Sequence, residues 1–525
     1  MNLIKDVWLP ITRKDGTNYK IAFWQLLDNY EDNPIVELWA PRPDFRNALY
    51  QLLIGIIQVA AMPSDEDVWA ELWEQPYLSD VFKEKILKYE HCFEIDSAGP
   101  AFMQDFDLSE GEEKPVSTLL IEAPGDKTIR DNSDHFIKRD TVNKINPYWS
   151  AIALYTLQTF APSGGAGHRV GLRGGGPLTT MLLPTNGGTL WEKIWINVLC
   201  SDDIDGLPGN IQHTNDSDIF PWMKETKESN KKGTDLLPSE CNPLHAFFGM
   251  PRRIRLKFSN TNGSCDLTGE TSEMLVTTYI TKNYGNNYNG PWLHPLNAYS
   301  FNPKKPEEIP LPIKAQPGGV YYRHWLGLVL KSEVVFPAKV VQLLQSSEER
   351  KNIVRKKGFI LWAAGFDMDN MKARCWYEST MPVFAIEKSK LDYLSVFINS
   401  FINNAQKSAI YLKSGVKAAW FNSPKEVKGD ISFLETSFWQ NTEKEFYEIL
   451  KESIDNIESP SEMNLIVERW KKVLNEETLR LFDTWALAQQ EDGLDMKRVI
   501  KARNELERGI YKITKSLNEL KQEEE

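Results

Sequence analysis

The sequence predicts an α+β fold in which a large mixed α/β domain, residues 1–387, precedes a C-terminal four-helix bundle, residues 388–525. In the first part, short β-like runs alternate with helical stretches and Gly/Asn/Pro-rich loops. From about Lys388, the apolar residues instead keep the spacing of amphipathic helices. The length of 525 residues also exceeds what one hydrophobic core usually serves, so two or more domains are expected.

The mixed domain contains candidate strands and helices without any repeating period. The candidate strands are residues 253–258, 275–280, 326–330 and 359–362, and the candidate helices are residues 44–62, 148–160 and 191–199. The apolar run 48–62 is interrupted by Gln51 and Gln58 and falls short of the roughly 20 residues that span a bilayer. We therefore expect a buried core helix there and no association with a membrane.

Four amphipathic helices with short connections are predicted after residue 388. The first carries Leu394, Ile398 and Phe401, and the second covers about residues 431–457. Ser459-Pro460 is typical of a helix start, and Gly493 separates the third helix from a fourth that continues to about Leu517. This arrangement favours an up-and-down bundle.

Charge and cysteine content limit the classes of function. A net charge of −12 argues against nonspecific coating of nucleic acid, although basic runs at 252–257, 304–305 and 350–357 could act locally. The plain interpretation of each run is a solvated face. Five widely spaced cysteines and a start without a secretory signature indicate a reducing compartment, so we expect a cytoplasmic protein.

The glycine-rich segment 163–176 contains neither the P-loop spacing nor a clean dinucleotide-binding fingerprint. Its glycines allow a backbone to approach a ligand closely, and His168, Arg169 and Arg173 add positive or partly positive groups. A narrow groove, such as the minor groove of DNA, suits such a segment. A structural loop of tight turns is the alternative.

A second segment, GFDMDNMKARCW at 365–376, allows two functional interpretations. Asp367 and Asp369 could ligate a divalent metal in a nucleic-acid hydrolase, although the EF-hand pattern is absent. Alternatively, the segment is a hairpin tip that exposes Asn370, Met371 and Lys372, an apolar wedge with polar flanks that pries base steps apart. The aspartates could also simply cap the turn.

Two further observations concern DNA reading and catalysis. The polar loop 128–139 combines amide, imidazole, aromatic and cationic side chains that could contact base edges and phosphate, or it is a solvated linker. The sequence contains no G-x-S-x-G, H-E-x-x-H or C-x-x-C motif, and its seven histidines are scattered. We therefore expect a protein that is not an enzyme and needs no cofactor.

Several segments together resemble CasA, the large subunit of the type I-E CRISPR complex called Cascade. These segments are MNLIKDVWLPI at the start, AIALYTLQTFA continuing into SGGAGHRVGLRGGGPLTT, the short run WLHP, and GFDMDNMKARCW. The resemblance spans essentially the whole chain. It implies an α/β body with a C-terminal four-helix bundle.

The resemblance also implies a mechanism. In that family the subunit reads the protospacer-adjacent motif (PAM) on double-stranded target DNA from the minor groove, and a loop then wedges the duplex open so that the guide RNA pairs. The implied partners are the other Cascade subunits, the 5′ end region of the guide crRNA, target DNA and a helicase–nuclease that is recruited to cut.

The family's functional positions can be placed on this sequence. The glycine loop corresponds to Gly164, Gly165 and Gly167 with His168 and Arg169, the wedge to Asn370, Met371 and Lys372, and a lysine finger to Lys282. The loop that anchors the subunit near the guide RNA corresponds to Asn132, His135, Phe136 and Lys138. Paired cysteines that would hold a metal in some relatives are reduced here to Cys265, so no metal is expected.

Two other hypotheses compete with this one. The first is the metal-dependent nucleic-acid hydrolase that uses Asp367 and Asp369. The second is an architectural protein whose bundle only bridges partners.

Overall fold

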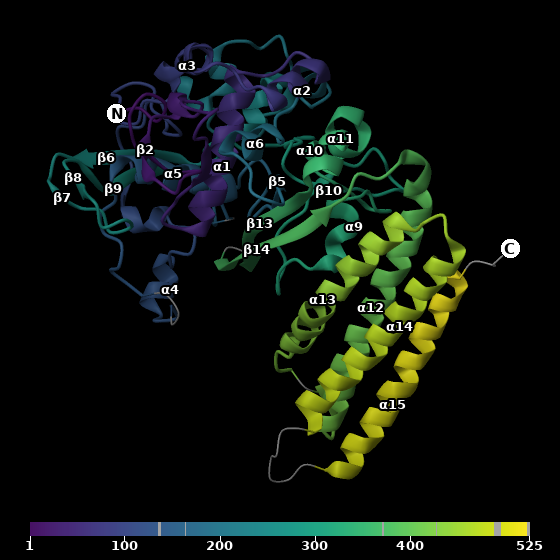
Figure 1. Ribbon diagram of the computed structural model, residues 1–525. Helices are drawn as coiled ribbons and strands as arrows, with labels where there is room; N and C mark the ends of the chain where they lie inside the picture. The colour runs from purple at the N-terminus through teal and green to yellow at the C-terminus, as the bar shows by residue number, and fades with distance from the viewer. Residues whose placement is uncertain (135–137, 163, 370–371, 427, 488–494, 522–525) are drawn as a thin grey trace. The chain divides into compact units, whose positions relative to one another are not determined.

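The computed structural model describes residues 1–134, 138–162, 164–369, 372–426, 428–487 and 495–521 (Figure 1). The chain forms two compact units. The mixed unit consists of Met1–Pro317 and Phe336–Val383, and the helical unit consists of Gly318–Val335 and Phe384–Glu525. The boundary predicted after residue 387 lies close to the last of these breaks, whereas the grouping of residues 318–335 with the helices is not predicted from the sequence.

The mixed unit is built on two buried helices that pack together, α1 (Pro43–Ala60) and α5 (Pro147–Phe160). α5 begins where the Asn146 side chain accepts the N–H of Trp149 at 2.9 Å and Pro147 occupies the first turn. The two glutamines of α1 are buried, and Gln58 exchanges two 2.8 Å hydrogen bonds with the backbone of Leu199. The predicted buried helix is therefore confirmed, and its glutamines are satisfied.

The mixed unit also contains antiparallel three-stranded sheets. Their strand orders are β2 (Asn18–Ile21), β1 (Leu9–Arg13), β3 (Ile35–Leu38); then β4 (Glu112–Pro115), β9 (Leu275–Lys282), β6 (Arg253–Ser259); and β14 (Lys372–Val383), β13 (Phe359–Asp369), β5 (Thr179–Pro184). Three of the predicted strands thus exist, and the strand predicted at 359–362 is the start of a much longer one.

Shorter elements complete the mixed unit. They include α2 (Glu66–Glu74), α3 (Ser79–Leu87), α4 (Asp126–Arg130), α6 (Leu190–Trp195), α7 (Ser201–Asp205), α8 (Asp216–Ile219), α10 (Lys339–Ser346), α11 (Glu348–Lys357), and the small strand pairs β7 (Gly263–Ser264) with β8 (Thr271–Ser272) and β10 (Tyr299–Ser300) with β11 (Leu311–Pro312). The short strand β12 (Val335–Phe336) stands where the chain passes from one unit to the other. The predicted helix at 191–199 is shorter than expected.

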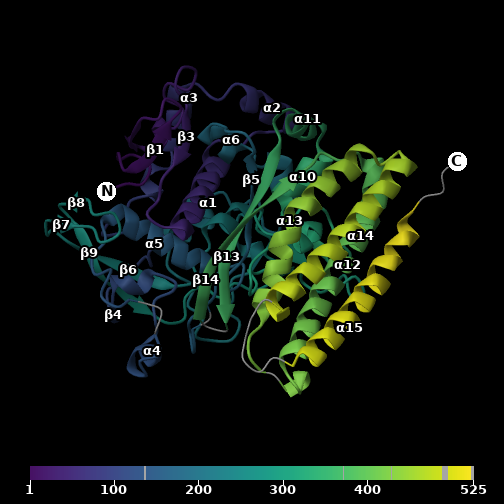
Figure 2. The same ribbon diagram turned by 60° about the horizontal axis from the view of Figure 1, so that its bottom comes forward.

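The helical unit contains the four predicted helices. They are α12 (Leu391–Trp420), α13 (Ser432–Asp455), α14 (Pro460–Phe482) and α15 (Met496–Lys515), and Figures 1 and 2 show them side by side. The ring of Phe401 stacks on that of Trp470, with centroids 5.9 Å apart, in the apolar core between the helices. The predicted break at Gly493 lies outside the described residues.

The predicted strand at 326–330 is wrong. This stretch belongs to the helical unit and forms a single irregular turn, α9 (Trp325–Leu328), because Gly327 adopts a positive φ of 102° and reverses the chain. Tyr322 lies in the same part of the helical unit, Gly318–Val335. Its ring stacks on Phe446 with centroids 4.2 Å apart, and its hydroxyl lies 2.9 Å from that of Thr442. This packing explains why residues 318–335 join the bundle.

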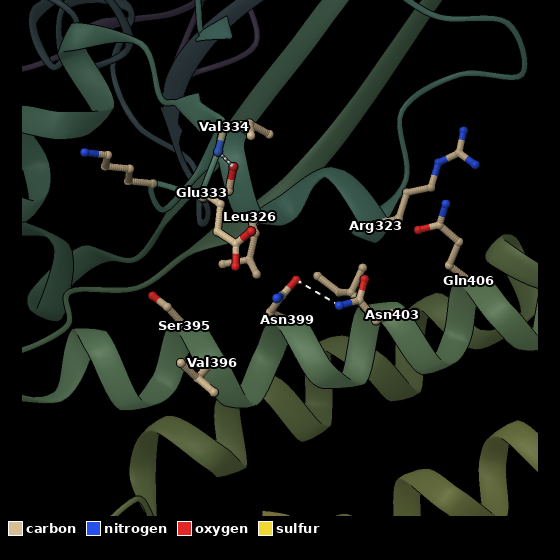
Figure 3. Close-up of a pocket in the computed structure, with 12 residues that line it drawn as sticks. Arg323, Leu326, Glu333, Val334, Ser395, Val396, Asn399, Asn403 and Gln406 are labelled. Atoms are coloured by element: carbon tan, nitrogen blue, oxygen red, sulfur yellow. Dashed lines mark hydrogen bonds between the residues drawn. The ribbon is translucent and has the colours of Figure 1, made fainter. Parts of the chain in front are cut away.

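A pocket of about 300 Å³ lies within the helical unit, between this segment and α12 (Figure 3). Amide side chains of Asn399, Asn403 and Gln406 line one wall, and Arg323 lies beside Gln406 at one end. None of the described residues that are expected to contact DNA lines this pocket. Over the described part of the chain, no helix is long and apolar enough to cross a membrane.

Candidate nucleic-acid interface

The first half of the glycine-rich segment forms a turn at the surface of the mixed unit. Gly165 and Gly167 have φ values of +82° and +79°, which L side chains rarely adopt. A Cβ added at Gly165 would meet no heavy atom within 4 Å, whereas one at Gly167 would lie 2.7 Å from the Cβ of Asn283. Gly165 therefore faces open space, and Gly167 is needed for close packing.

The two residues that follow strand β9 hold this turn in place. The Tyr284 N–H donates to the Gly167 carbonyl at 2.8 Å, and the Asn283 amide donates to the Ala166 carbonyl at 3.1 Å. Lys282 is exposed at the end of the same strand. The structure thus brings Lys282 next to residues that contact the glycine turn, although the two segments are far apart in the sequence.

His168 is held beside the turn by a neighbouring arginine. Its Nδ1 lies 2.5 Å from a guanidinium nitrogen of Arg252, so Nδ1 accepts and Nε2 carries the ring proton. Partial burial, and then the positive charges of Arg252 and Lys114, lower the pKa of His168. His168 is therefore a neutral hydrogen-bond donor at pH 7 rather than a positive charge.

Arg169 is less available for phosphate than the sequence suggests. Its Nε donates to the Ser229 hydroxyl at 2.7 Å, and one terminal nitrogen donates to the Ser229 carbonyl at 2.6 Å. Its guanidinium also lies 5.8 Å from the ring of Tyr284. Only the other terminal nitrogen has no hydrogen bond within the described part of the chain.

Arg173 is buried, so of the three positive or partly positive groups predicted for a ligand, it is not available. It is 4% exposed, and it donates to Thr179 at 3.0 Å and to Gln51 at 2.7 Å. Burial lowers the pKa of Arg173 to about 10, so it stays charged at pH 7. Arg173 links the glycine segment to the core helix α1.

The solvated-face interpretation is also wrong for several members of the basic runs. Arg253 is buried and pairs with Asp105 at 2.7 Å, and the half-buried Arg255 donates to backbone carbonyls. Arg350 is fully buried, lies 4.0 Å from the ring centre of Trp69 and pairs with Glu66 at 3.1 Å. These arginines stabilise the fold.

The segment 365–376 forms the end of a long hairpin, β13–β14. Residue pairing runs from Phe359 with Val383 to Asp369 with Lys372, and Lys372 is exposed at the start of β14. Asn370 and Met371, the other two expected wedge residues, lie between Asp369 and Lys372 and outside the described residues. In both views, this end of the hairpin and helix α4 lie on the lower side of the mixed unit (Figures 1 and 2).

A bulge near the hairpin's end explains the role of Asp367. The pairing shifts by one residue between Asp367 and Met368, so that Arg374 is the extra residue on β14. Arg374 donates to both carboxylate oxygens of Asp367, at 3.0 and 2.8 Å, and Asp367 is 2% exposed. Its carboxylate thus neutralises a guanidinium, which argues against the proposed metal site with Asp369.

The second half of the glycine segment packs on this hairpin. A Cβ at Gly176 would lie 2.5 Å from the Cγ of Met368 and 2.6 Å from the Phe366 carbonyl. Phe160, the last residue of α5 before the segment, contacts the rings of Phe366 and Trp376, with centroids 5.9 and 5.4 Å away. The glycine segment and the hairpin therefore form one packed region.

The expected anchoring loop is organised by Arg139, one of the cationic residues of the polar loop 128–139 that could contact phosphate. Arg139 pairs with Asp134 at 2.5 Å and donates to the Asn132 side chain and the Ile129 carbonyl, both at 3.1 Å. Asn132 and Lys138 are exposed, whereas His135 and Phe136 lie outside the described residues. An arginine that follows a run of Asn and Asp acceptors is the signal that could have revealed this clamp.

Comparison with known proteins agrees with this architecture. Residues 2–481 match the family model described as CRISPR-associated protein Cse1. CasA of Thermus thermophilus is similar at a TM-score of 0.68 and 16% identity over 98% of this chain and 99% of that chain. Cse1 of Acidimicrobium ferrooxidans is similar at a TM-score of 0.66 and 16% identity, over 98% of this chain and 99% of that chain. A chain of a CRISPR RNA-guided surveillance complex is similar at a TM-score of 0.62 and 15% identity, over 97% of this chain and 99% of that chain. At these identities, the structural likeness shows a shared fold.

Proposed function

The chain belongs to the CRISPR-associated Cse1 family, and we propose that it is the large subunit of an RNA-guided surveillance complex. In this role its mixed unit reads a short motif on double-stranded DNA and starts the opening of the duplex. A relative with the same fold is a chain of such a complex, which supports the assignment. The proposed partners are the other subunits, the 5′ end of the guide RNA, target DNA and a recruited helicase–nuclease.

One observation carries the DNA-reading part of the proposal: the glycine turn presents open backbone, while hydrogen bonds from Asn283 and Tyr284, which follow strand β9, fix its other side. A minor groove is about 6 Å wide, so a turn that enters it backbone-first comes closest where its residues are glycines. Gly165 meets this need because nothing surrounds its Cβ position. The turn also keeps its shape before binding, which reduces the entropy lost on association.

His168 and Lys282 give the proposed reader its chemistry. The floor of the minor groove presents hydrogen-bond acceptors on A·T and T·A pairs. A neutral His168 whose Nε2 carries the proton offers a donor to such an acceptor without the desolvation of a full charge. Lys282, at the end of β9, is proposed to contact a phosphate beside the groove.

The β13–β14 hairpin is the proposed wedge. Its strands are paired up to Asp369 and Lys372, and the bulge is locked by the Arg374–Asp367 pair. Force at its tip is therefore borne by a stiff element that packs on Phe160 and Gly176. We assign Asn370, Met371 and Lys372 to the tip, and Asn132, His135, Phe136 and Lys138 to the contact with the guide-RNA end.

The test uses the assembled complex and two forms of one target, a closed duplex and a duplex that is already unpaired beside the motif. Lys372→Ala and Asn370→Ala should weaken capture of the closed duplex about tenfold and of the opened duplex much less, because only the closed form requires unstacking. Lys14→Ala, an exposed lysine in the β1–β2 connection, is the charge-matched control and should leave both affinities unchanged. Equal losses on both targets would remove the wedge assignment.

The metal-dependent hydrolase has no observation in its favour. The carboxylate of Asp367 is occupied by Arg374. Substitution of Asp367 by Asn should therefore weaken the hairpin rather than abolish any cleavage.

A further inference from the structure

The geometry points to a binding site for a divalent transition metal of the zinc class, formed by His91, Cys92 and Asp216. Their ligand atoms all lie within 4.8 Å of one another. His91 Nε2 is 2.7 Å from an Asp216 carboxylate oxygen and 3.4 Å from the Cys92 sulfur. Imidazole, thiolate and carboxylate are the three ligand types that zinc takes in proteins.

The distances suit a tetrahedral ion. With bonds of about 2.0 Å to nitrogen or oxygen and about 2.3 Å to sulfur, two ligand atoms around zinc lie about 3.3–3.7 Å apart. The nitrogen–sulfur distance already lies in this range. The nitrogen–oxygen distance is that of a hydrogen bond and would widen by roughly half an ångström when the ion replaces the proton.

The supporting structure fixes two of these ligands before any ion arrives. Cys92 ends a short 3-10 turn, Glu90–Cys92, and its carbonyl accepts the indole N–H of Trp222 at 2.6 Å. Asp216 begins α8, and the next residue after that helix, Phe220, packs its ring on Phe93 at 5.4 Å. The two ligand-bearing segments are thus joined by a buried aromatic cluster although 125 residues separate His91 from Asp216.

Charge and access favour an ion at this position. The thiol of Cys92 is buried, and zinc binds cysteine as the thiolate. One thiolate and one carboxylate balance a divalent ion. The His91 side chain is 53% exposed, which leaves a path from solvent and room for a water as fourth ligand.

A second cluster of similar composition provides the contrast. Glu66, Cys200 and Asp203 also lie within 4.8 Å of one another. There, however, Glu66 pairs with the buried guanidinium of Arg350 at 3.1 Å, and Lys339 pairs with Asp203 at 3.0 Å. Two cations already balance that cluster. Asp216, by contrast, forms no ion pair with a lysine or arginine of the described residues, and its partner is His91.

Binding would release one proton per ion. The Cys92 S–H bond breaks and a metal–sulfur bond forms, and the proton goes to solvent. His91 binds the ion through the lone pair of Nε2, and its ring proton then lies on Nδ1. No electron is transferred, and no further reactant is required.

The experiment titrates the reduced, metal-stripped full chain with Co²⁺, which reports thiolate ligation by an absorption band in the near ultraviolet. We expect one Co²⁺ per chain, one released proton, and loss of the band when Zn²⁺ is added. His91→Gln and Asp216→Asn, both outside the buried core, should each weaken binding more than about tenfold. Cys92→Ser should abolish the band.

The matched controls are Cys200→Ser in the charge-balanced cluster and Cys375→Ser at the exposed cysteine, and both should keep the band at full strength. The absence of a band in the wild-type chain overturns the site. A band that survives Cys92→Ser or is unaffected by both His91→Gln and Asp216→Asn overturns it as well. This test is independent of DNA binding, so its outcome does not depend on the proposed function.

Discussion

The two halves of the glycine-rich segment are similar in composition, but they have different surroundings. In the first half, Gly165 lies in open space, and Arg169 is partly exposed. In the second half, Gly176 is enclosed by the β13–β14 hairpin, and Arg173 is buried against α1. Glycine therefore suits close approach to a ligand in one half and close packing of the protein itself in the other.

The largest expected difference concerns Gly176 and Gly187, which share a φ of +63°. An alanine at Gly187 meets nothing within 4 Å, so Gly187→Ala should lower the free energy of unfolding by about 1–2 kcal/mol from the backbone strain alone. Gly176→Ala adds contacts with Met368 and the Phe366 carbonyl and should lose about 3 kcal/mol or more. Denaturant unfolding followed by tryptophan fluorescence measures both, and equal losses would show that the hairpin yields to the added methyl.

The next contrast compares the two arginines. Arg173→Met leaves the side chains of Gln51 and Thr179 without their donor in a buried site, so stability should fall by about 2 kcal/mol. Arg169→Met loses two bonds to the buried Ser229, but Arg169 is itself partly exposed and the Ser229 hydroxyl still donates to the Gly285 carbonyl, so the cost should be about 1 kcal/mol or less. The midpoints of chemical denaturation decide the order, and a larger loss for Arg169→Met would contradict it.

A finer contrast lies inside the first half. Gly165→Ala and Gly167→Ala impose nearly the same backbone strain, but only the second pushes against Asn283. We expect Gly167→Ala to be the less stable by about 1 kcal/mol. Hydrogen exchange at the Tyr284 amide, which donates to the Gly167 carbonyl, should become faster in that variant alone. Unchanged exchange would mean that the turn tolerates a side chain at this contact.

The smallest effect is a titration. Because the folded state lowers the pKa of His168, the neutral ring contributes stability that is fully present above the unfolded value of about 6.5 and is lost as the pH falls through the folded value. An NMR titration of the ring should place its pKa below 6.5, and Arg252→Gln should raise it. A pKa that does not respond to this substitution would show that the Arg252 charge does not contribute to it.

Structure that is determined by local pattern could be predicted from the sequence. The helical spacing of Leu394, Ile398 and Phe401 predicted α12, and Ser459-Pro460 marked the start of α14 within one residue. The pairing of Asp369 with Lys372 likewise agrees with the hairpin interpretation of residues 365–376. These features depend on neighbours only a few residues away, so periodicity and turn propensity are sufficient.

The burial of a charged side chain whose partner lies far away in the sequence could not be predicted. Arg350 reads as part of a solvated basic face, but it pairs with Glu66, 284 residues earlier. Arg173 likewise bonds Gln51, 122 residues away. No local pattern reveals such pairs, because burial of a guanidinium is decided by tertiary packing. The DNA-contacting roles of Gly164, His168 and Lys282 stay predictions for experiment.

Because residues 318–335 belong to the helical unit, they affect the order in which this unit folds during synthesis and the choice of fragments that can contain it. Tyr322 leaves the ribosome 120 residues before Thr442, its partner in the bundle core, so this part of the core waits for synthesis of α13. A fragment that starts at Phe384 would contain all four helices but lack Tyr322, so Phe446 would lose the ring that stacks on it. The helical unit is therefore compact in space but is encoded by two separate stretches of the sequence.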